Sequence, residues 1–230
     1  MKYKIENSGL KEGDQHSSLL KVAFQPDDVF KSRASSMMSF GGDLKTSTTT
    51  TRSMWKAITT FENFPITKVK AESSGNGGVV TFSPPLPGEI MDLSPTGNKL
   101  NVQSLGFLGA PENFSINLDM SKMYQSDSLA TLEIEKAEDN DNFNKVFVAG
   151  FGGVTEVKLG ENERTHVSED YLLAMDATVS FKRSNKSNIR QTAFDAHSTP
   201  NIDVSGPGSV YMHSRSPFKF ERAMDKLDEY

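Results

Sequence analysis

A glycine-rich turn that opens into alternating residues occurs three times in this chain, and it constrains the fold more than any other feature. The three copies begin at Gly75, Gly150 and Gly206, and after the last one the residues from Val210 to Arg215 alternate between two faces. Glycine and proline suit tight turns, and alternation predicts a strand with one buried face. We therefore expect three turn-to-strand corners of one kind in a repetitive all-β body.

The remaining strands are expected to be short. Leu19–Phe24 alternates, with Leu20 and Val22 on its apolar side. Asp43–Thr51 is β-branched but polar, which predicts a sheet edge or a solvated face, with a protein-binding edge as the alternative. Turn signals recur about every 8–12 residues, a spacing typical of a sandwich, barrel or prism.

Two short helices are expected beside the strands. Met54, Ile58 and Phe61 have helical spacing next to the single tryptophan, which predicts a short internal helix. At the C-terminus, Met224 and Leu227 continue an apolar stripe from residue 220 among charged residues. This pattern predicts an amphipathic helix over 217–230, which either docks on its own domain or covers a neighbouring subunit.

Composition limits the compartment and the chemistry. The 230 residues are expected to form a single domain, and their net charge of −5 argues against a protein that wraps nucleic acid. The absence of cysteine excludes disulfides and thiolate zinc sites and favours a reducing compartment. The N-terminus lacks a signal-peptide or transit-peptide pattern, and no apolar run reaches the roughly 18 residues of a membrane span. We therefore expect a cytoplasmic protein without a transmembrane segment.

An internal repeat extends beyond the glycine corners. Three segments contain a strand, a polar turn, a second strand and an apolar pair, and each is followed by a further strand. The apolar pairs end Ala34–Met38, Ser104–Leu108 and Ser168–Leu173, about 65–70 residues apart. Three units are therefore expected to fill the chain, at approximately 15–70, 71–128 and 129–216.

These segments resemble a known family, that of altered inheritance of mitochondria protein 24, within the TRAP-like group (tryptophan RNA-binding attenuator protein-like). The resemblance covers the chain from about Ile5 to Phe218. The chain departs from the family pattern at Ser36, where glycine or alanine is common, and in a polar insertion at 137–144. The segments that carry the resemblance are Ser35–Thr46, Pro87–Ile90, Gly106–Gly109 and, most specifically, Gly206–Pro217.

The resemblance implies a fold and leaves the function open. It implies a TRAP-like β-prism of three structural repeats, a short variant of the double-stranded β-helix. It implies no catalytic residues, since none is established in the family, and fungal members are associated with inner-membrane organisation in mitochondria. RNA binding by a protein of similar fold is an analogy only, because function depends on sites.

Glycine and acidic motifs do not support a phosphate or calcium site. The glycine corners are followed by strands, whereas a dinucleotide fingerprint needs a strand before it and a helix after it. Asp139–Asp141 resembles the start of a calcium loop but has Asn144 at the sixth position and Gly150 at the twelfth. We therefore expect no catalytic, cofactor-binding or metal-binding residues.

Two residue sets keep alternative functions open. The histidines contain no His-x-His pair, so only a meeting of His197 and His213 supports a cupin-like metal site. A basic loop without interleaved aromatic residues is an alternative contact for phosphate or anionic lipid. The histidines are His16, His166, His197 and His213, and the basic residues are Lys182, Arg183, Lys186 and Arg190.

The preferred hypothesis is a non-enzymatic scaffold or binding module that self-associates, as a trimer or larger, through the Thr-rich edge or the C-terminal helix. An RNA-binding protein by TRAP-like analogy is the first alternative. A cupin-like metalloenzyme is the second.

Overall fold

The computed structural model describes residues 1–7, 18–50, 65–119, 131–137, 143–183 and 201–228. Strands dominate these ranges, which confirms the all-β prediction. The predicted C-terminal helix is present as α2 (Pro217–Asp228). The helix predicted around Met54 lies outside the described residues.

Strands of similar order recur along the chain, with a short 3-10 turn between the second and third strand of each group. The first group comprises β2 (Ser18–Phe24), β3 (Val29–Arg33), η1 (Ala34–Ser36), β4 (Met37–Gly42), β5 (Leu44–Thr50), β6 (Pro65–Ala71) and β7 (Gly78–Phe82), preceded by β1 (Lys2–Asn7). The second comprises β8 (Ile90–Leu93), η2 (Thr96–Asn98), β9 (Lys99–Gln103), η3 (Ser104–Gly106), β10 (Phe107–Pro111), β11 (Phe114–Asp119), β12 (Thr131–Lys136) and β13 (Val146–Ala149). The third comprises β14 (Val154–Leu159), β15 (Arg164–Ser168), η5 (Glu169–Tyr171), β16 (Leu172–Asp176), β17 (Ser180–Arg183), β18 (Asn201–Ser205) and β19 (Gly208–His213).

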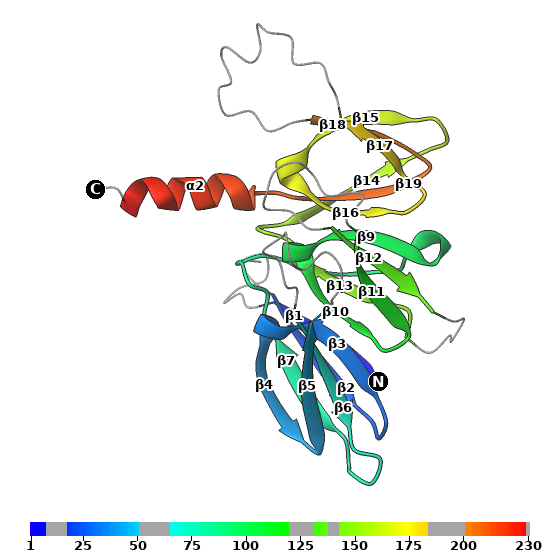
Figure 1. Cartoon of the computed structure of the whole chain (residues 1–230), viewed down its shortest axis with the longest axis vertical. Helices are drawn as coiled ribbons and strands as arrows, with labels where there is room; N and C mark the ends of the chain where they lie inside the picture. Colours follow the sequence, from blue (N-terminus) through cyan, green and yellow to red (C-terminus); the bar gives the residue numbers. More distant parts are fainter. Residues whose placement is uncertain (8–17, 51–64, 120–130, 138–142, 184–200, 229–230) are drawn as a thin grey trace, which may run out of the picture.

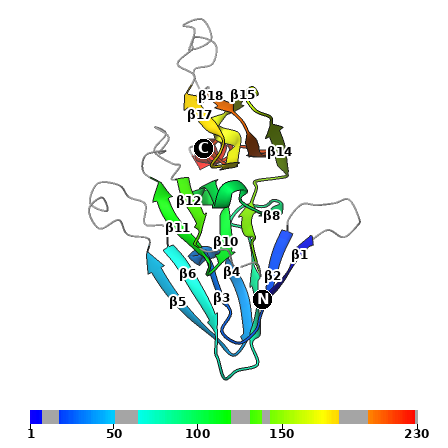
Figure 2. The ribbon, with the colours of Figure 1, turned by 90° about the vertical axis from the view of Figure 1, so that its right-hand side faces the viewer.

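The sheets join neighbouring groups. One six-stranded sheet has the order β5-β6-β3-β10-β13-β8, so half of it comes from the first group and half from the second. The other, β11-β12-β9-β16-β19-β14, joins the second group to the third in the same way. Two smaller sheets remain at the ends, β1-β2-β7-β4 and β15-β18-β17. Figures 1 and 2 show the result as a stack, with the first group at one end and the third at the other.

Three apolar clusters fill the stack, one in each group's neighbourhood. The first is built around Phe30 and Phe82, the second around Phe107 and Phe114, and the third around Met175. Because each six-stranded sheet lies between two clusters, its central strands bury both faces. Burial of apolar side chains on this scale is the main favourable term in folding.

The strand after the third glycine corner corrects one sequence prediction. Val210 and Tyr211 are both buried, and they belong to two different clusters. The predicted single buried face is therefore wrong for β19, because this strand is central in its sheet and has a core on each side. The predicted edge position of the Thr-rich strand is confirmed, since β5 ends its sheet.

The three glycine corners are not equivalent. The first connects β6 to β7 and the third connects β18 to β19 within one group, whereas the second connects β13 of one group to β14 of the next. In all three cases the two connected strands lie in different sheets, so none of the corners is a hairpin. At the second corner, Gly88 and Gly152 form an isolated bridge, and a Cβ at Gly88 would lie 2.0 Å from the Gly150 carbonyl oxygen. Only glycine fits this close approach at position 88.

Candidate interaction surface

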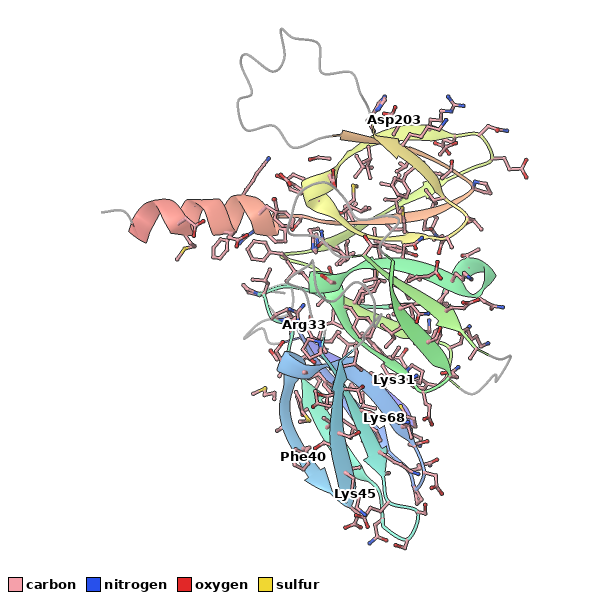
Figure 3. The ribbon with its side chains drawn as sticks, in the orientation of Figure 1. Lys31, Arg33, Phe40, Lys45, Lys68 and Asp203 are labelled. Atoms are coloured by element: carbon pink, nitrogen blue, oxygen red, sulfur yellow. The ribbon has the colours of Figure 1, made fainter. Side chains whose placement is uncertain are left out.

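An exposed apolar surface lies on the outer strand of the first group. Met38 and Phe40 on β4 are 65% and 55% exposed, and Val79 on the neighbouring β7 is 48% exposed. Val79 pairs with Gly41, one position along from the pair of Phe40 with Val80, so Val79 and Phe40 lie on opposite faces of the sheet. Met38 and Phe40, on the edge strand itself, mark a candidate site for a partner. Figure 3 labels Phe40 on β4, near the end of the stack that the first group forms.

A β-bulge follows each of three 3-10 turns and sets the direction of these side chains. The pairing register shifts between Met37 and Ser39 in β4, and equivalent shifts occur in β10 and β16. In each strand the extra residue is the second member of the apolar pair: Met38, Leu108 and Leu173. A bulge turns a side chain away from the regular alternation, so these three residues occupy corresponding places.

Corresponding residues in the other two groups are buried. Leu108 and Leu173 are fully buried, in contrast to Met38. The place of Phe40 is taken by Ala110 and Met175, which are 0% and 1% exposed. The difference follows from strand neighbours: β10 and β16 each pair on both edges, whereas β4 pairs with β7 alone among the described residues.

A second exposed apolar surface lies on α2. Figure 1 shows this helix projecting from the body. The helix contacts the turn η5. Its first turn is anchored, because Phe218 is buried and the Phe220 ring meets that of Phe151 edge to face at 5.2 Å. Phe220 and Met224 are each 46% exposed. The side chain of Leu227, predicted to share this stripe, lies outside the described side chains.

Junctions between groups are held by basic side chains as well as by strand pairing. Lys31 on β3 donates its Nζ hydrogens to the carbonyl oxygens of Glu112 and Phe114, at 2.9 and 2.7 Å. Arg33 donates from Nη1 to the Ser104 carbonyl, which opens η3, at 3.1 Å. Burial lowers the pKa of Lys31, while the nearby Glu112 opposes that shift. Figure 3 shows Lys31 and Arg33 where the first group meets the second.

His213 is a buried structural histidine. The Phe151 backbone N–H donates to its Nδ1 at 2.9 Å, so that nitrogen is unprotonated and Nε2 donates to the Gln103 Oε1 at 3.0 Å. Burial lowers the pKa of His213 to about 4, which keeps the ring neutral near pH 7. The adjoining cavity measures about 10 Å³, which is space for one water at most.

The other predicted site residues do not come together in the described structure. His166 pairs with Asp203 on the exposed side of β15 and β18, whereas His16 and His197 lie outside the described residues. Within the ranges given above, no group of three His, Asp or Glu side chains is arranged to hold a metal ion. The predicted metal-pair alternative therefore stays a prediction.

Only the start of the predicted basic loop is described. Lys182 is exposed on β17 and Arg183 ends that strand, while Lys186, Arg190 and the acidic loop at 139–141 lie outside the described residues. In the described part of the chain, no helix combines the length and apolar character needed to cross a membrane.

The β4 surface was missed in the sequence, although a signal existed. Met37, Met38 and Phe40 form an apolar run bounded by serine and glycine. By pattern alone, such a run is indistinguishable from its counterparts in the other two groups, which are buried. Its exposure depends on which strand lies beside β4, and that neighbour is set by the whole topology.

Comparisons with known proteins agree with this architecture. A family model described as mitochondrial biogenesis AIM24 matches residues 11–215. A crystal structure of protein SPYM3_0169 from Streptococcus pyogenes is similar with a TM-score of 0.76 and 12% identity, over 98% of this chain and 99% of that one. At this identity the likeness concerns the fold alone. No curated protein matches the chain.

Proposed function

The chain belongs to the mitochondrial biogenesis AIM24 family, and on that premise we propose that it is a non-enzymatic scaffold that works as a homo-oligomer. The description of the family names a cellular process, mitochondrial biogenesis, and no chemical reaction. The proposal therefore depends on the surface that the chain presents.

The exposed apolar edge of β4 carries the proposal. An unpaired strand edge is a template for another strand, and monomeric proteins commonly protect it with charge, proline or a covering loop. β4 instead presents Met38 and Phe40, and its other residues Met37, Ser39, Gly41 and Gly42 carry no charge. Within the described part of the chain, the strand β4 carries neither charge nor proline, and such an edge is suited to permanent pairing in an assembly.

We assign the body to a TRAP-like β-prism of three structural repeats. The recurrence of strand, 3-10 turn and bulged strand supports this assignment. On this assignment the units would span 18–82, 90–149 and 154–213, in place of the 15–70, 71–128 and 129–216 expected from the sequence. The difference arises because β7 closes the first unit's sheet, although it follows the first glycine corner.

RNA binding and cupin-like catalysis are not favoured by any observation in the described residues. The cytoplasmic location also stays a prediction: the absence of cysteine favours a reducing compartment, whereas the family description refers to mitochondria.

The mass of the untagged protein in solution tests the proposal. Light scattering is expected to give a trimer or larger, with an absorbance ratio typical of protein alone and no stoichiometric metal. A monomer across the accessible concentration range, or an assembly that carries nucleic acid or metal in stoichiometric amount, contradicts it.

A further inference from the structure

We propose that the assembly forms head to tail, with β15 of one copy added to the outer edge of β4 in a second copy. This inference rests on the proposed function and names its partner, which is a second copy of this chain. It is argued from the two junctions that a single chain already contains.

Both internal junctions use the same pair of strands. At the first, β3, which precedes a 3-10 turn, pairs antiparallel with β10, which follows the next turn. At the second, β9 pairs antiparallel with β16 in the same relation. β15 precedes the turn η5, so by this rule its partner is a strand that follows a 3-10 turn. Among the described residues, β4 follows such a turn and has no strand in the place that β3 and β9 take beside β10 and β16. The two ends of the stack are therefore complementary.

The register of both junctions is also identical when it is counted from the turns. The turns used for counting are η1, η3 and η5. At each junction, one partner lies two positions before the first residue of a turn. The other partner lies five positions after the first residue of the following turn in this series. The pairs that define this register are Ser32 with Gly109 and Val102 with Ala174. Applied to β15 and β4, the same register has one solution. The expected pairs are Val167 with Ser39, His166 with Phe40 and Thr165 with Gly41.

Sheet composition supports the same join. Each six-stranded sheet consists of a half that ends in β3 or β9 and a half that begins with β10 or β16. Each of the two end sheets corresponds to one such half. The sheet β15-β18-β17 corresponds to the half that ends in β3 or β9, and β4-β7-β2-β1 corresponds to the half that begins with β10 or β16. Joining them across two copies makes one continuous sheet, β17-β18-β15-β4-β7-β2, in the order of the internal ones, with β1 as an additional strand at its end.

Side chains along the expected row follow the internal pattern. A row here means residues that lie opposite one another on successive strands of a sheet. At the second junction, a polar row is joined to an apolar row by the pair of Asn101 with Met175. The polar row is Asn117, Glu133 and Asn101, and the apolar row is Met175, Val210 and Val157. In the proposed junction, the polar row Lys182, Asp203 and His166 meets the apolar row Phe40, Val80 and Val22. The exposed Phe40 thus gains the position in which Met175 is buried.

The contact joins two different surfaces and is therefore heterologous. Figures 1 and 2 show β4 and β15 at opposite ends of the stack, so one chain is not expected to close on itself. Heterologous contacts give a ring if the rotation closes and a fibre if it does not. A closed trimer satisfies both edges of every copy.

Engineered disulfides test the contact and its register, and the natural chain contains no cysteine to interfere. Gly41→Cys is compatible with the fold because a Cβ there meets nothing within 4 Å, and Thr165→Cys is a small change at a half-buried position. Opposed residues of antiparallel strands have Cα atoms about 4.5–5.5 Å apart, within the range of a disulfide. Mixing the two single variants under mild oxidation is expected to give a covalent dimer on a non-reducing gel.

Ser168→Cys provides the matched control for register. It lies three positions from Thr165 on the same strand, or about 10 Å, so its mixture with Gly41→Cys is expected to lose the dimer band. An absent dimer, or equal dimer in both mixtures, overturns the proposed contact.

Light scattering on the same samples separates the two proposals. If the variants remain oligomeric but do not cross-link at Gly41 and Thr165, the scaffold stands and this interface is wrong. If every sample is monomeric and uncross-linked, both proposals fail.

Discussion

At the scale of single residues, the buried imidazole of His213 links stability to pH. Its pKa in the folded state, about 4, lies below the ordinary value of 6.5, so protons bind the unfolded chain more tightly. Its contribution is fully present above pH 6.5 and is lost as the pH falls toward 4. Between pH 7.5 and 5 we expect a loss of about 2 kcal/mol in the free energy of unfolding, which denaturant titration at each pH measures.

The variant His213→Gln isolates this effect. It removes the titrating ring, so the pH slope between 5 and 6.5 is expected to become shallower, even though the variant has its own baseline stability. Equal slopes for the two proteins would show that His213 does not titrate as its burial requires.

Gly106 tests the packing at the second junction. A Cβ at this position would lie 2.1 Å from the Leu173 Cδ1, and Leu173 is fully buried. Gly106→Ala is therefore expected to destabilise the fold by about 1–3 kcal/mol, because the fully buried Leu173 side chain must move to accept the methyl group. Gly41→Ala is the matched control and is expected to have little effect, since nothing lies within 4 Å of that Cβ.

Thermal or chemical unfolding measures both glycine variants. In the double variant Gly106→Ala with Leu173→Ala, the two changes are expected to be less than additive, since the shortened side chain leaves space for the new methyl group. Full additivity would show that the clash between these two positions is not the source of the cost.

At the scale of elements, sequence patterns predicted where strands and turns occur but not which strands are central. The strand Leu19–Phe24, the Thr-rich edge and the C-terminal helix are all present in the structure. β19 was predicted to have one buried face and has two, because alternation reports local periodicity and not the number of cores beside a strand. The exposure of Met38 depends equally on a distant neighbour, so the candidate surface could not be predicted from its own segment.

The helix α2 is expected to depend on its first turn. Phe218 is buried in the third apolar cluster, whereas Met224 is half exposed. Phe218→Ala should therefore lower the free energy of unfolding by about 3 kcal/mol, and Met224→Ala should change it by about 0.5 kcal/mol or less. Chemical denaturation of the two variants provides the measurement, and equal effects would contradict this anchoring.

At the scale of the whole molecule, the chain is an open stack whose ends match each other. Its internal junctions define a strand pair, a register and a polar strand facing an apolar one. Among the described strands, β4 at one end and β15 at the other each lack the neighbour that this pattern supplies elsewhere. This arrangement accounts for an apolar β4 edge in a protein with a net charge of −5. Assembly through the ends requires no catalytic group and no ligand.

The most direct test is the mass in solution of Phe40→Glu beside that of Val79→Glu. Both replace an exposed apolar residue of the same sheet with a charge, but only Phe40 lies in the expected contact with a second copy. Light scattering is predicted to find Phe40→Glu dissociated to the monomer, with Val79→Glu retaining the mass of the natural protein. If Phe40→Glu keeps the full assembly, or if both variants dissociate alike, head-to-tail assembly through β4 is wrong.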